Sequence, residues 1–402
     1  MLKKKTLLIL TNNYPCKEWE VAGTFVKSQV NELKKHFKKI IVLSQNPYFP
    51  RILGKMNIFP NLFQNYSKPR NYKYDNVEVY YIRYITPFKD ILNLRGKLLH
   101  KAISKFIKKH NLFFDIIHAH FTYPSGYVAT LLKKEFNKKA VITIHENKDL
   151  FISEEKSKDP KIINTWKNAD LLIRVNKKDL DILRKYNKNS IFLPNGYTSK
   201  NFKKIPQNVA RKHLSLPIEK KILLNLATFR IHHKNQLTLI KAIKELIKIR
   251  KDFILYLIGI GEDENKIKQS IKKEELDPFV KILHHQPRAN IPIWMNAADL
   301  FVLPSYSEGN PTVMFETLGC ATPFIGTKVG GIPEVITSKD YGLLIEDPED
   351  FKALAKTLDF ALNKKWNYSK IKEYSKEFTW KNICTLLIKK YECLIKNGDK
   401  NS

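Results

Sequence analysis

The stretch Leu300–Gly319, LFVLPSYSEGNPTVMFETLG, joins a strand, a turn and the start of a helix. Its first four residues are apolar, which is typical of a short buried strand, and turn-forming residues follow them. Asn310 is a favourable N-cap residue and Pro311 suits the first helical position, so we expect a helix from there to Leu318. A strand that leads directly into a helix is the repeating unit of parallel α/β sheets.

Similar units recur along most of the chain, where short apolar runs alternate with helix-compatible segments. In the first half we expect strands at Thr6–Leu10, Ile40–Ser44, Val77–Arg83, Asp115–His118, Ala140–His145, Leu171–Val175 and Ile191–Leu193, and a first helix at Phe25–Phe37. In the second half we expect strands at Lys221–Ala227, Phe253–Gly259, Val280–His284, Leu300–Pro304, Pro323–Thr327 and Gly342–Ile345. This pattern predicts an α/β fold of two Rossmann-like, doubly wound domains, with a cleft at the carboxyl ends of the strands.

The length of the chain also favours two domains, because 402 residues exceed what a single typical core holds. Between Asn195 and Glu219 the alternation weakens, and Pro206 and Pro217 stand among polar residues. We therefore expect the interdomain linker in this segment.

The chain is strongly basic, with 71 Lys and Arg against 39 Asp and Glu, a formal net charge of +32. This charge suits nucleic acid, an anionic membrane surface or phosphorylated small molecules, but no RRM, KH or zinc-finger pattern accompanies it. The basic segment Ile91–His110 fits a crossover helix on the first sheet, with attachment to anionic lipid as the alternative. No apolar run approaches the ~20 residues of a membrane span, and four cysteines without a CxxC pair suggest a reducing cytoplasm.

Two glutamates, Glu308 and Glu316, stand on either side of the Gly-Asn-Pro turn. Gly309 permits close backbone approach, and the first amides of the helix, those of Thr312 and Val313, form an anion site. A carboxylate accepts two parallel hydrogen bonds, as vicinal hydroxyls offer. We therefore expect the glutamates to bind the sugar and the ribose of a nucleotide sugar, with its diphosphate at the amides.

The wider segment PSYSEGNPTVMFETLGCATPFIGTKVGGIPEVI, Pro304–Ile336, resembles the signature of retaining glycosyltransferase family 4, which has the GT-B fold. The likeness covers nearly the whole chain. TNNYP…AGTFV resembles the glycine loop after the first strand, with Gly23 at the matching glycine, and DIIHAHFTYPSG resembles a strand motif whose second histidine, here His120, faces the donor sugar. VITIHENKDL and IFLPNGY resemble the His-Gly-x-Asp and Pro-Asn-Gly segments, and FTWKNI resembles the C-terminal helix that crosses back onto the first domain.

The resemblance implies an acceptor-binding domain over residues 1–200, a donor-binding domain over 201–377 and a returning helix over 378–402. It also implies an arginine and a lysine that clasp the diphosphate after the first strand of the second domain. In NLATFRIHHKNQ, Lys234 takes the lysine position and Arg230 is our candidate for the arginine, although an ungapped comparison places Phe229 there.

These groups predict the chemistry. Lys234, Arg230 and the helix amides would stabilise the departing diphosphate, while His120 and Glu308 would position the hexose. The donor-binding residues that we expect are Gly23, Gly309, Asn310, Thr312, Val313 and Glu316. We recognise no Asp-x-Asp motif to hold a metal between phosphates, so we expect neither a metal nor another cofactor.

The sequence thus predicts a metal-independent, retaining glycosyltransferase that uses a nucleoside diphosphate sugar and a glycan, lipid-linked or small-molecule acceptor. The alternatives are a GT-B nucleotide-sugar epimerase and a basic, non-catalytic protein that binds nucleic acid or membrane. Besides donor and acceptor, we expect association with an anionic membrane and no nucleic-acid partner. The expected location is cytoplasmic, peripheral on the cytoplasmic membrane face.

Overall fold

The computed structural model describes residues 1–17, 20, 22–48, 69–86, 94–284 and 286–399. The chain forms two compact units: unit 1 is Met1–Pro194 together with Ile383–Ser402, and unit 2 is Asn195–Asn382. The chain therefore passes between the units at Pro194 and Asn382, where the sequence comparison suggested boundaries at residues 200 and 377.

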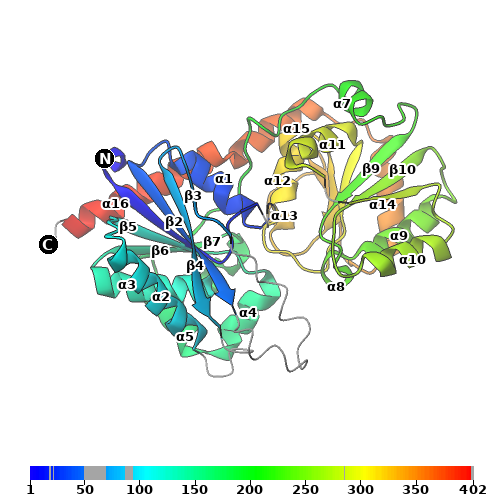
Figure 1. Cartoon of the computed structure of the whole chain (residues 1–402). Helices are drawn as coiled ribbons and strands as arrows, with labels where there is room; N and C mark the ends of the chain where they lie inside the picture. Colours follow the sequence, from blue (N-terminus) through cyan, green and yellow to red (C-terminus); the bar gives the residue numbers. More distant parts are fainter. Residues whose placement is uncertain (18–19, 21, 49–68, 87–93, 285, 400–402) are drawn as a thin grey trace. The chain divides into compact units, whose positions relative to one another are not determined.

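Unit 1 is built on a sheet of eight strands among its described residues, in the order β3-β4-β2-β1-β5-β6-β7-β8 (Figure 1). The strands are β1 (Thr6–Thr11), β2 (Lys39–Tyr48), β3 (Tyr72–Tyr74), β4 (Val77–Ile85), β5 (Ile116–His120), β6 (Lys139–Ile144), β7 (Leu171–Arg174) and β8 (Ser190–Phe192). The seven expected strands are all present, and β3 is an addition that pairs antiparallel with β4. The central strand β1 is buried along its whole length, as parallel strands covered by helices on both faces are.

Helices cover both faces of this sheet (Figure 1). The helices of unit 1 are α1 (Thr24–Leu33), α2 (Arg95–Lys109), α3 (Tyr127–Phe136), α4 (Lys148–Ser157), α5 (Pro160–Asn168), α6 (Leu180–Arg184) and α16 (Trp380–Asp399), of which α16 enters the unit at Ile383. The first helix ends four residues before the expected Phe37. Within the segment predicted at Ile91–His110, residues 91–93 lie outside the described residues, and α2 packs its apolar side on the sheet as a crossover helix does.

Unit 2 contains a fully parallel sheet of six strands among its described residues, in the order β11-β10-β9-β12-β13-β14. The strands are β9 (Lys221–Leu226), β10 (Phe253–Ile258), β11 (Val280–Leu283), β12 (Leu300–Leu303), β13 (Phe324–Thr327) and β14 (Gly342–Ile345). The helices are α7 (Gln207–His213), α8 (Ile231–Lys234), α9 (Gln236–Leu246), α10 (Glu264–Lys273), α11 (Ile291–Ala297), α12 (Thr312–Gly319), α13 (Ile332–Val335), α14 (Phe351–Asn363) and α15 (Tyr368–Ser375).

The predicted linker at Asn195–Glu219 is wrong, because this segment is an integral part of unit 2. It contains helix α7, and Phe202 and Ala210 are buried in the unit's core. Arg211 anchors the segment by donating from Nη2 to the Asp299 carboxylate at 2.6 Å and from Nε to the Ala297 carbonyl at 3.0 Å. The prolines border a short packed helix and do not mark a flexible connection.

Both sheets have a topological switch point beside their first strand. In unit 1 the chain order reverses between β1 and β5, and in unit 2 it reverses between β9 and β12. At such a point the loops leaving the two strands turn to opposite sides, which opens a crevice at the carboxyl edge where ligands bind. Residues that follow these four strands are therefore the first place to look for a site in each unit.

Candidate functional site

Two residues of unit 2 that were predicted to contact the donor form an ion pair with each other. Lys234 ends α8 after β9, and Glu308 lies in the loop after β12. The Lys234 Nζ and Glu308 Oε1 atoms are 2.6 Å apart, and the Ser305 hydroxyl donates to the same oxygen at 2.6 Å. The side chains are only 16% and 6% exposed, respectively. The switch point therefore brings together a cation, a carboxylate and a hydroxyl.

Asn235 fixes the position of the lysine. It has a left-handed backbone, with φ of 58°, directly after α8. Its side-chain amide donates to the carbonyls of Pro304 at 2.9 Å and Pro348 at 2.7 Å. These bonds tie the end of α8 to the loop after β12, so that Lys234 and Glu308 face each other.

A pair of glycines supports the loop that carries Glu308. Gly330 has φ of +53°, and a Cβ there would lie 1.9 Å from the Glu308 carbonyl oxygen. The neighbouring Gly331 amide donates to the Gly309 carbonyl at 2.7 Å. Because only glycine fits this left-handed position without strain and without a clash, the glycine pair holds the Glu308–Gly309 turn.

The N-terminus of α12 differs from the prediction. The helix begins at Thr312, its N-cap is Pro311, and no side chain caps it. Asn310, the expected cap, instead accepts a hydrogen bond from the Asn195 amide at 2.8 Å, while Asn195 Nδ2 donates to the Asn310 carbonyl at 2.8 Å. The first-turn amides of Thr312 and Val313 therefore have no side-chain acceptor among the described residues, which leaves them available to an anion.

Glu316 lies one turn further along α12 and is buried. Its Oε1 accepts a hydrogen bond from Arg288 Nη2, but its Oε2 is buried without a partner among the described residues. Burial raises the pKa of this carboxyl above its ordinary value, although Arg288 opposes the shift. An unpartnered buried oxygen is costly, so a hydroxyl donor from a ligand would complete the site.

Sequence reasoning missed Arg288, which lies in the 3-10 turn Arg288–Asn290. Its position in the sequence could have indicated a site residue, because this arginine follows β11 at the same carboxyl edge of the sheet. The prediction of Arg230 finds less support: its side chain is 60% exposed, and its ion-pair partner is Glu262 at 3.8 Å. Phe229, in the alternative position, is fully buried in the core against α9 and α10.

Two arrangements of possible metal ligands were also not recognised in the sequence. His232, Glu262 and Asp263 place ligand atoms within 4.8 Å of one another, but the Asp263 carboxylate already accepts from the Ile231 amide at 3.0 Å and from Lys266 at 2.9 Å. An Asp-x-Asp string occurs in unit 1 at residues 179–181, where both aspartates are paired with arginines. Neither arrangement is part of the Lys234–Glu308 site.

In unit 1, His120 is the last residue of β5 and belongs to a histidine cluster, which consists of the buried His118 and His120 and the half-buried His145. His120 Nδ1 lies 2.9 Å from His145 Nε2, and its Nε2 is buried without a partner among the described residues. Burial lowers the pKa of His120 to about 3, so the ring is neutral. A neutral ring with one free nitrogen can form one hydrogen bond with a hydroxyl.

His118 differs from His120, whereas His145 resembles it, because its Nδ1 is also buried without a partner among the described residues. His118 uses both ring nitrogens, with the Thr143 hydroxyl at 2.7 Å and the Tyr391 hydroxyl of α16 at 2.6 Å, which is a structural role.

Gly23 has φ of +70°, and a Cβ there would lie 2.2 Å from the Asn13 carbonyl oxygen. The turn before α1 thus requires glycine, whether or not Gly23 also contacts a ligand.

Comparisons with known proteins agree with this geometry. A family model described as "Glycosyl transferases group 1" matches residues 206–378, and one described as "Glycosyltransferase Family 4" matches residues 58–199. An uncharacterized glycosyltransferase of Methanocaldococcus jannaschii is 27% identical over 87% of this chain and 97% of its own length. The putative teichuronic acid biosynthesis glycosyltransferase TuaC of Bacillus subtilis is 26% identical over 88% of each chain.

Solved structures show the same fold. Sucrose-phosphate synthase from Thermosynechococcus elongatus superposes with a TM-score of 0.79 at 19% identity, covering 98% of this chain and all of the other. HepE of Anabaena, in complex with UDP and glucose, superposes with a TM-score of 0.71 at 18% identity, covering 97% of this chain and 99% of the other. The chain has the GT-B fold, and the two family matches together span more than three quarters of its length. It belongs to glycosyltransferase family 4, and its second unit is a glycosyl transferases group 1 domain.

Proposed function

We propose that this protein transfers a glycosyl group from a nucleoside diphosphate sugar to a hydroxyl acceptor, with retention of anomeric configuration and without a metal. The observation that carries the proposal is the juxtaposition of Lys234 and Glu308 at the switch point of unit 2. The uncapped N-terminus of α12 follows the same loop, and Glu316 presents a free buried oxygen from that helix. A cation, exposed amides and two carboxylates match the phosphates and hydroxyls of such a donor.

In the proposed reaction, the bond between the anomeric carbon and the phosphate oxygen breaks, and negative charge develops on the diphosphate. The Lys234 ammonium and the amides of Thr312 and Val313 stabilise this charge, as a metal does in other enzymes. Glu308 accepts hydrogen bonds from the hexose, and Glu316 accepts them from the ribose. The acceptor hydroxyl gives its proton to the departing phosphate and attacks from the same side, which retains the configuration.

Roles in unit 1 are proposed from the family resemblance. The free Nε2 of His120 would bond a hydroxyl of the transferred sugar, and the acceptor would be bound by this unit. UDP is a reasonable first donor nucleotide, because the structurally similar HepE is known in complexes with UDP and UDP-glucose. The excess of positive charge favours an acceptor presented at an anionic membrane face.

The test is to incubate the purified protein with a panel of UDP-, GDP- and ADP-sugars, selecting donors first by the thermal stabilisation they produce. Transfer in the presence of EDTA, with a product of the donor's anomeric configuration by NMR, is the expected result. Activity that disappears with EDTA and returns with Mg²⁺ would contradict the metal-independent mechanism. Release of an epimerised nucleotide sugar without transfer would identify an epimerase instead.

A further inference from the structure

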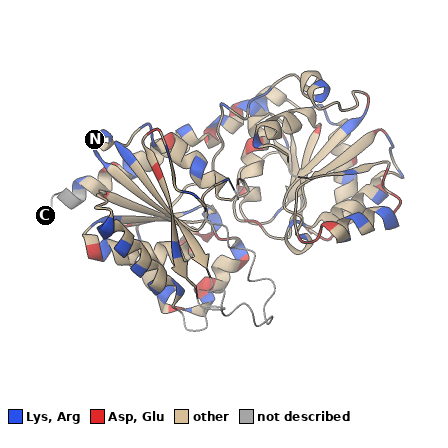
Figure 2. Ribbon diagram, in the orientation of Figure 1, with Lys and Arg blue, Asp and Glu red and all other residues tan. Residues whose placement is uncertain are grey.

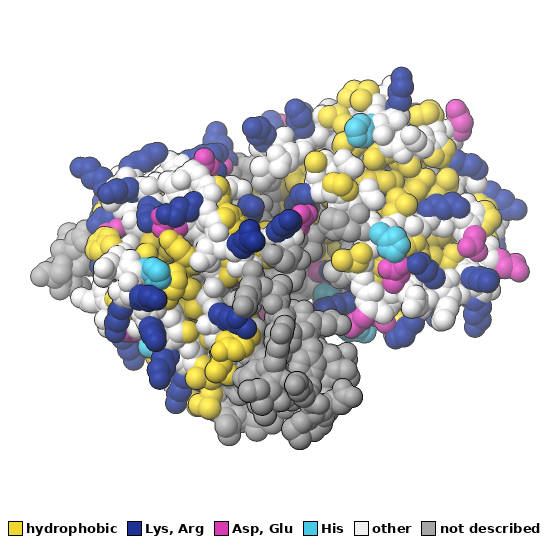
Figure 3. Space-filling model, viewed as in Figure 1, with side chains coloured by type: hydrophobic (Ala, Val, Ile, Leu, Met, Phe, Trp, Pro, Cys, Tyr) yellow, Lys and Arg dark blue, Asp and Glu magenta, His cyan; other side chains and the backbone are white. Residues whose placement is uncertain are grey.

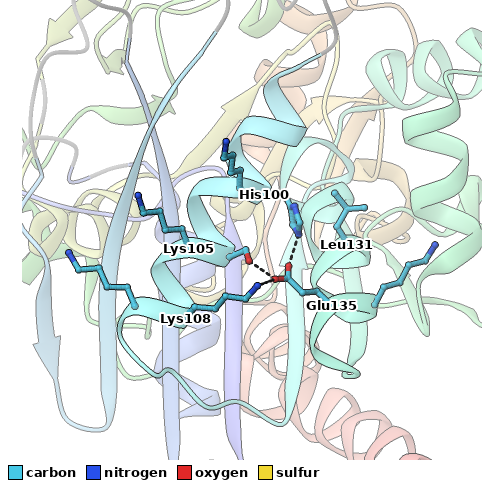
Figure 4. A pocket seen from close by; sticks show the side chains of 9 residues that line it. His100, Lys105, Lys108, Leu131 and Glu135 are labelled. Carbon is cyan, nitrogen blue, oxygen red and sulfur yellow. Dashed lines mark hydrogen bonds and ion pairs between the residues drawn. The ribbon is translucent and has the colours of Figure 1, made fainter.

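A concave surface lies on α2 and α3 in unit 1. It is a hollow of about 890 Å³, and lysines from both helices line it together with Leu131 (Figure 4). In ribbon view, blue Lys and Arg positions recur along both helices (Figure 2). We call this surface the basic face and define it by Lys101, Lys105 and Lys109 of α2 and Lys134 of α3.

The hollow contains one acid, Glu135, and its charge is already balanced. The Glu135 carboxylate accepts from the Ser104 hydroxyl at 2.5 Å, lies 3.0 Å from His100 Nε2 and pairs with Lys108 Nζ at 2.5 Å (Figure 4). The four lysines of the basic face are exposed and have no carboxylate partner among the described residues. Like charges held together on a concave surface concentrate positive potential, which attracts anions.

Packing limits how this face can bind a partner. The apolar residues of α2 that would enter a bilayer, Leu99, Ile103 and Ile107, are already buried against the sheet. The helix therefore cannot insert its apolar side, and contact with a membrane would be electrostatic. No helix among the described residues is both long enough and apolar enough to cross a bilayer.

The segment that follows α2 exposes one aromatic side chain. Phe113, in the segment after α2, is 66% exposed, and Lys138 Nζ lies 5.1 Å from its ring centre. The space-filling view shows dark blue side chains crowding the part of unit 1 that α2 and α3 occupy (Figure 3). An aromatic ring among lysines suits the headgroup region of a bilayer, where apolar and charged groups meet.

We propose that the basic face holds the protein on a bilayer that contains anionic phospholipid, with the lysine ammonium groups contacting lipid phosphates. A membrane is favoured over nucleic acid because the face is made of lysines, with no arginine to form bidentate contacts with phosphates or bases. This surface is distinct from the donor site, so the proposal does not depend on the transferase chemistry.

The test is co-sedimentation of the full chain with vesicles of phosphatidylcholine alone, or mixed with phosphatidylglycerol. The variant Lys101→Gln/Lys105→Gln/Lys109→Gln should bind the anionic vesicles on the order of 100-fold more weakly. Each lysine near an anionic surface raises the affinity about fivefold, and the variant removes three of them. The matched control, Lys241→Gln/Lys272→Gln/Lys273→Gln, removes the same charge from exposed lysines of unit 2 and should bind like the parent. Thermal unfolding of both variants checks that they fold.

Several outcomes would overturn the proposal. Equal losses in the two triple variants would show that only net charge matters, and binding to phosphatidylcholine vesicles as strong as to the anionic ones would exclude lipid charge. Loss of vesicle binding in millimolar inorganic phosphate at constant ionic strength would identify a site for free phosphate. RNA binding that depends on the basic face, without vesicle binding, would identify a nucleic-acid surface. Because vesicle binding is measured without a donor sugar, an inactive enzyme leaves the test intact.

Discussion

Replacing Lys234 with methionine separates the two roles that the structure gives this lysine. The substitution keeps a long side chain and removes the cation next to Glu308, whose side chain is only 6% exposed. Removing one partner of a buried ion pair costs about 3–5 kcal/mol, because the remaining charge stays buried and uncompensated. We expect a loss near the lower limit, about 3 kcal/mol, because the lysine is 16% exposed and Ser305 still donates to the same oxygen.

Together with Glu308→Gln and the double variant, Lys234→Met forms a double-mutant cycle. In Lys234→Met/Glu308→Gln the uncompensated charge is gone, so the free energy of unfolding should recover by about 1–3 kcal/mol relative to Lys234→Met. Activity should not recover, because the double variant still lacks the cation at the leaving diphosphate. Loss of one such preorganised group lowers kcat by about 100- to 1,000-fold.

Urea unfolding and initial rates of sugar transfer, measured on all four proteins, test the prediction. Stability and activity are expected to respond differently, because the second substitution should restore stability and should not restore kcat. If Lys234→Met is as stable as the parent, the ion pair is not formed in solution. If the double variant transfers sugar at the parent's rate, Lys234 does not act on the diphosphate.

Three further predictions concern other parts of the molecule. Burial lowers the pKa of every member of the histidine cluster, to about 3 for His120, so unit 1 should lose stability as pH falls below the ordinary value of 6.5. Each histidine contributes a slope of about 1.4 kcal/mol per pH unit in that range, and urea unfolding of His118→Gln should show a slope reduced by about one such increment. The Glu316→Gln substitution should raise the Kd for UDP by about 10- to 100-fold in calorimetry, since a hydrogen bond to a charged group contributes about 1.5–3 kcal/mol, and an unchanged Kd would remove Glu316 from the ribose site. Gly330→Ala should lower the free energy of unfolding by about 1–3 kcal/mol through its left-handed backbone, and the clash with the Glu308 carbonyl should add to this loss. Gly331→Ala is the control that should be tolerated, because φ is −84° there.

The local sequence pattern was sufficient to locate the expected strands of this protein. Buried parallel strands are short and continuously apolar, so each expected strand could be located within a few residues of its ends. The Glu308–Gly309 turn and the helix after it were likewise visible, because glycine and proline act on the backbone at their own positions. Even there, the N-cap assignment failed, since Asn310 bonds Asn195, a residue 115 positions away.

The pairing of the site residues depends on the tertiary structure. Lys234 and Glu308 are 74 positions apart, and Arg288 and Glu316 are 28 apart. Lys234 and Glu308 meet because the strand order places β9 beside β12, and no local pattern encodes which loops leave neighbouring strands. The same reason explains the misread segment after Asn195. Its turn residues suggested a linker, and only its contacts with α11 and with Asp299, just before β12, show that it belongs to the core of unit 2. The sequence by itself thus determined the type and order of the elements and the residues available for chemistry. Only the packing of distant strands decided which of those residues act together.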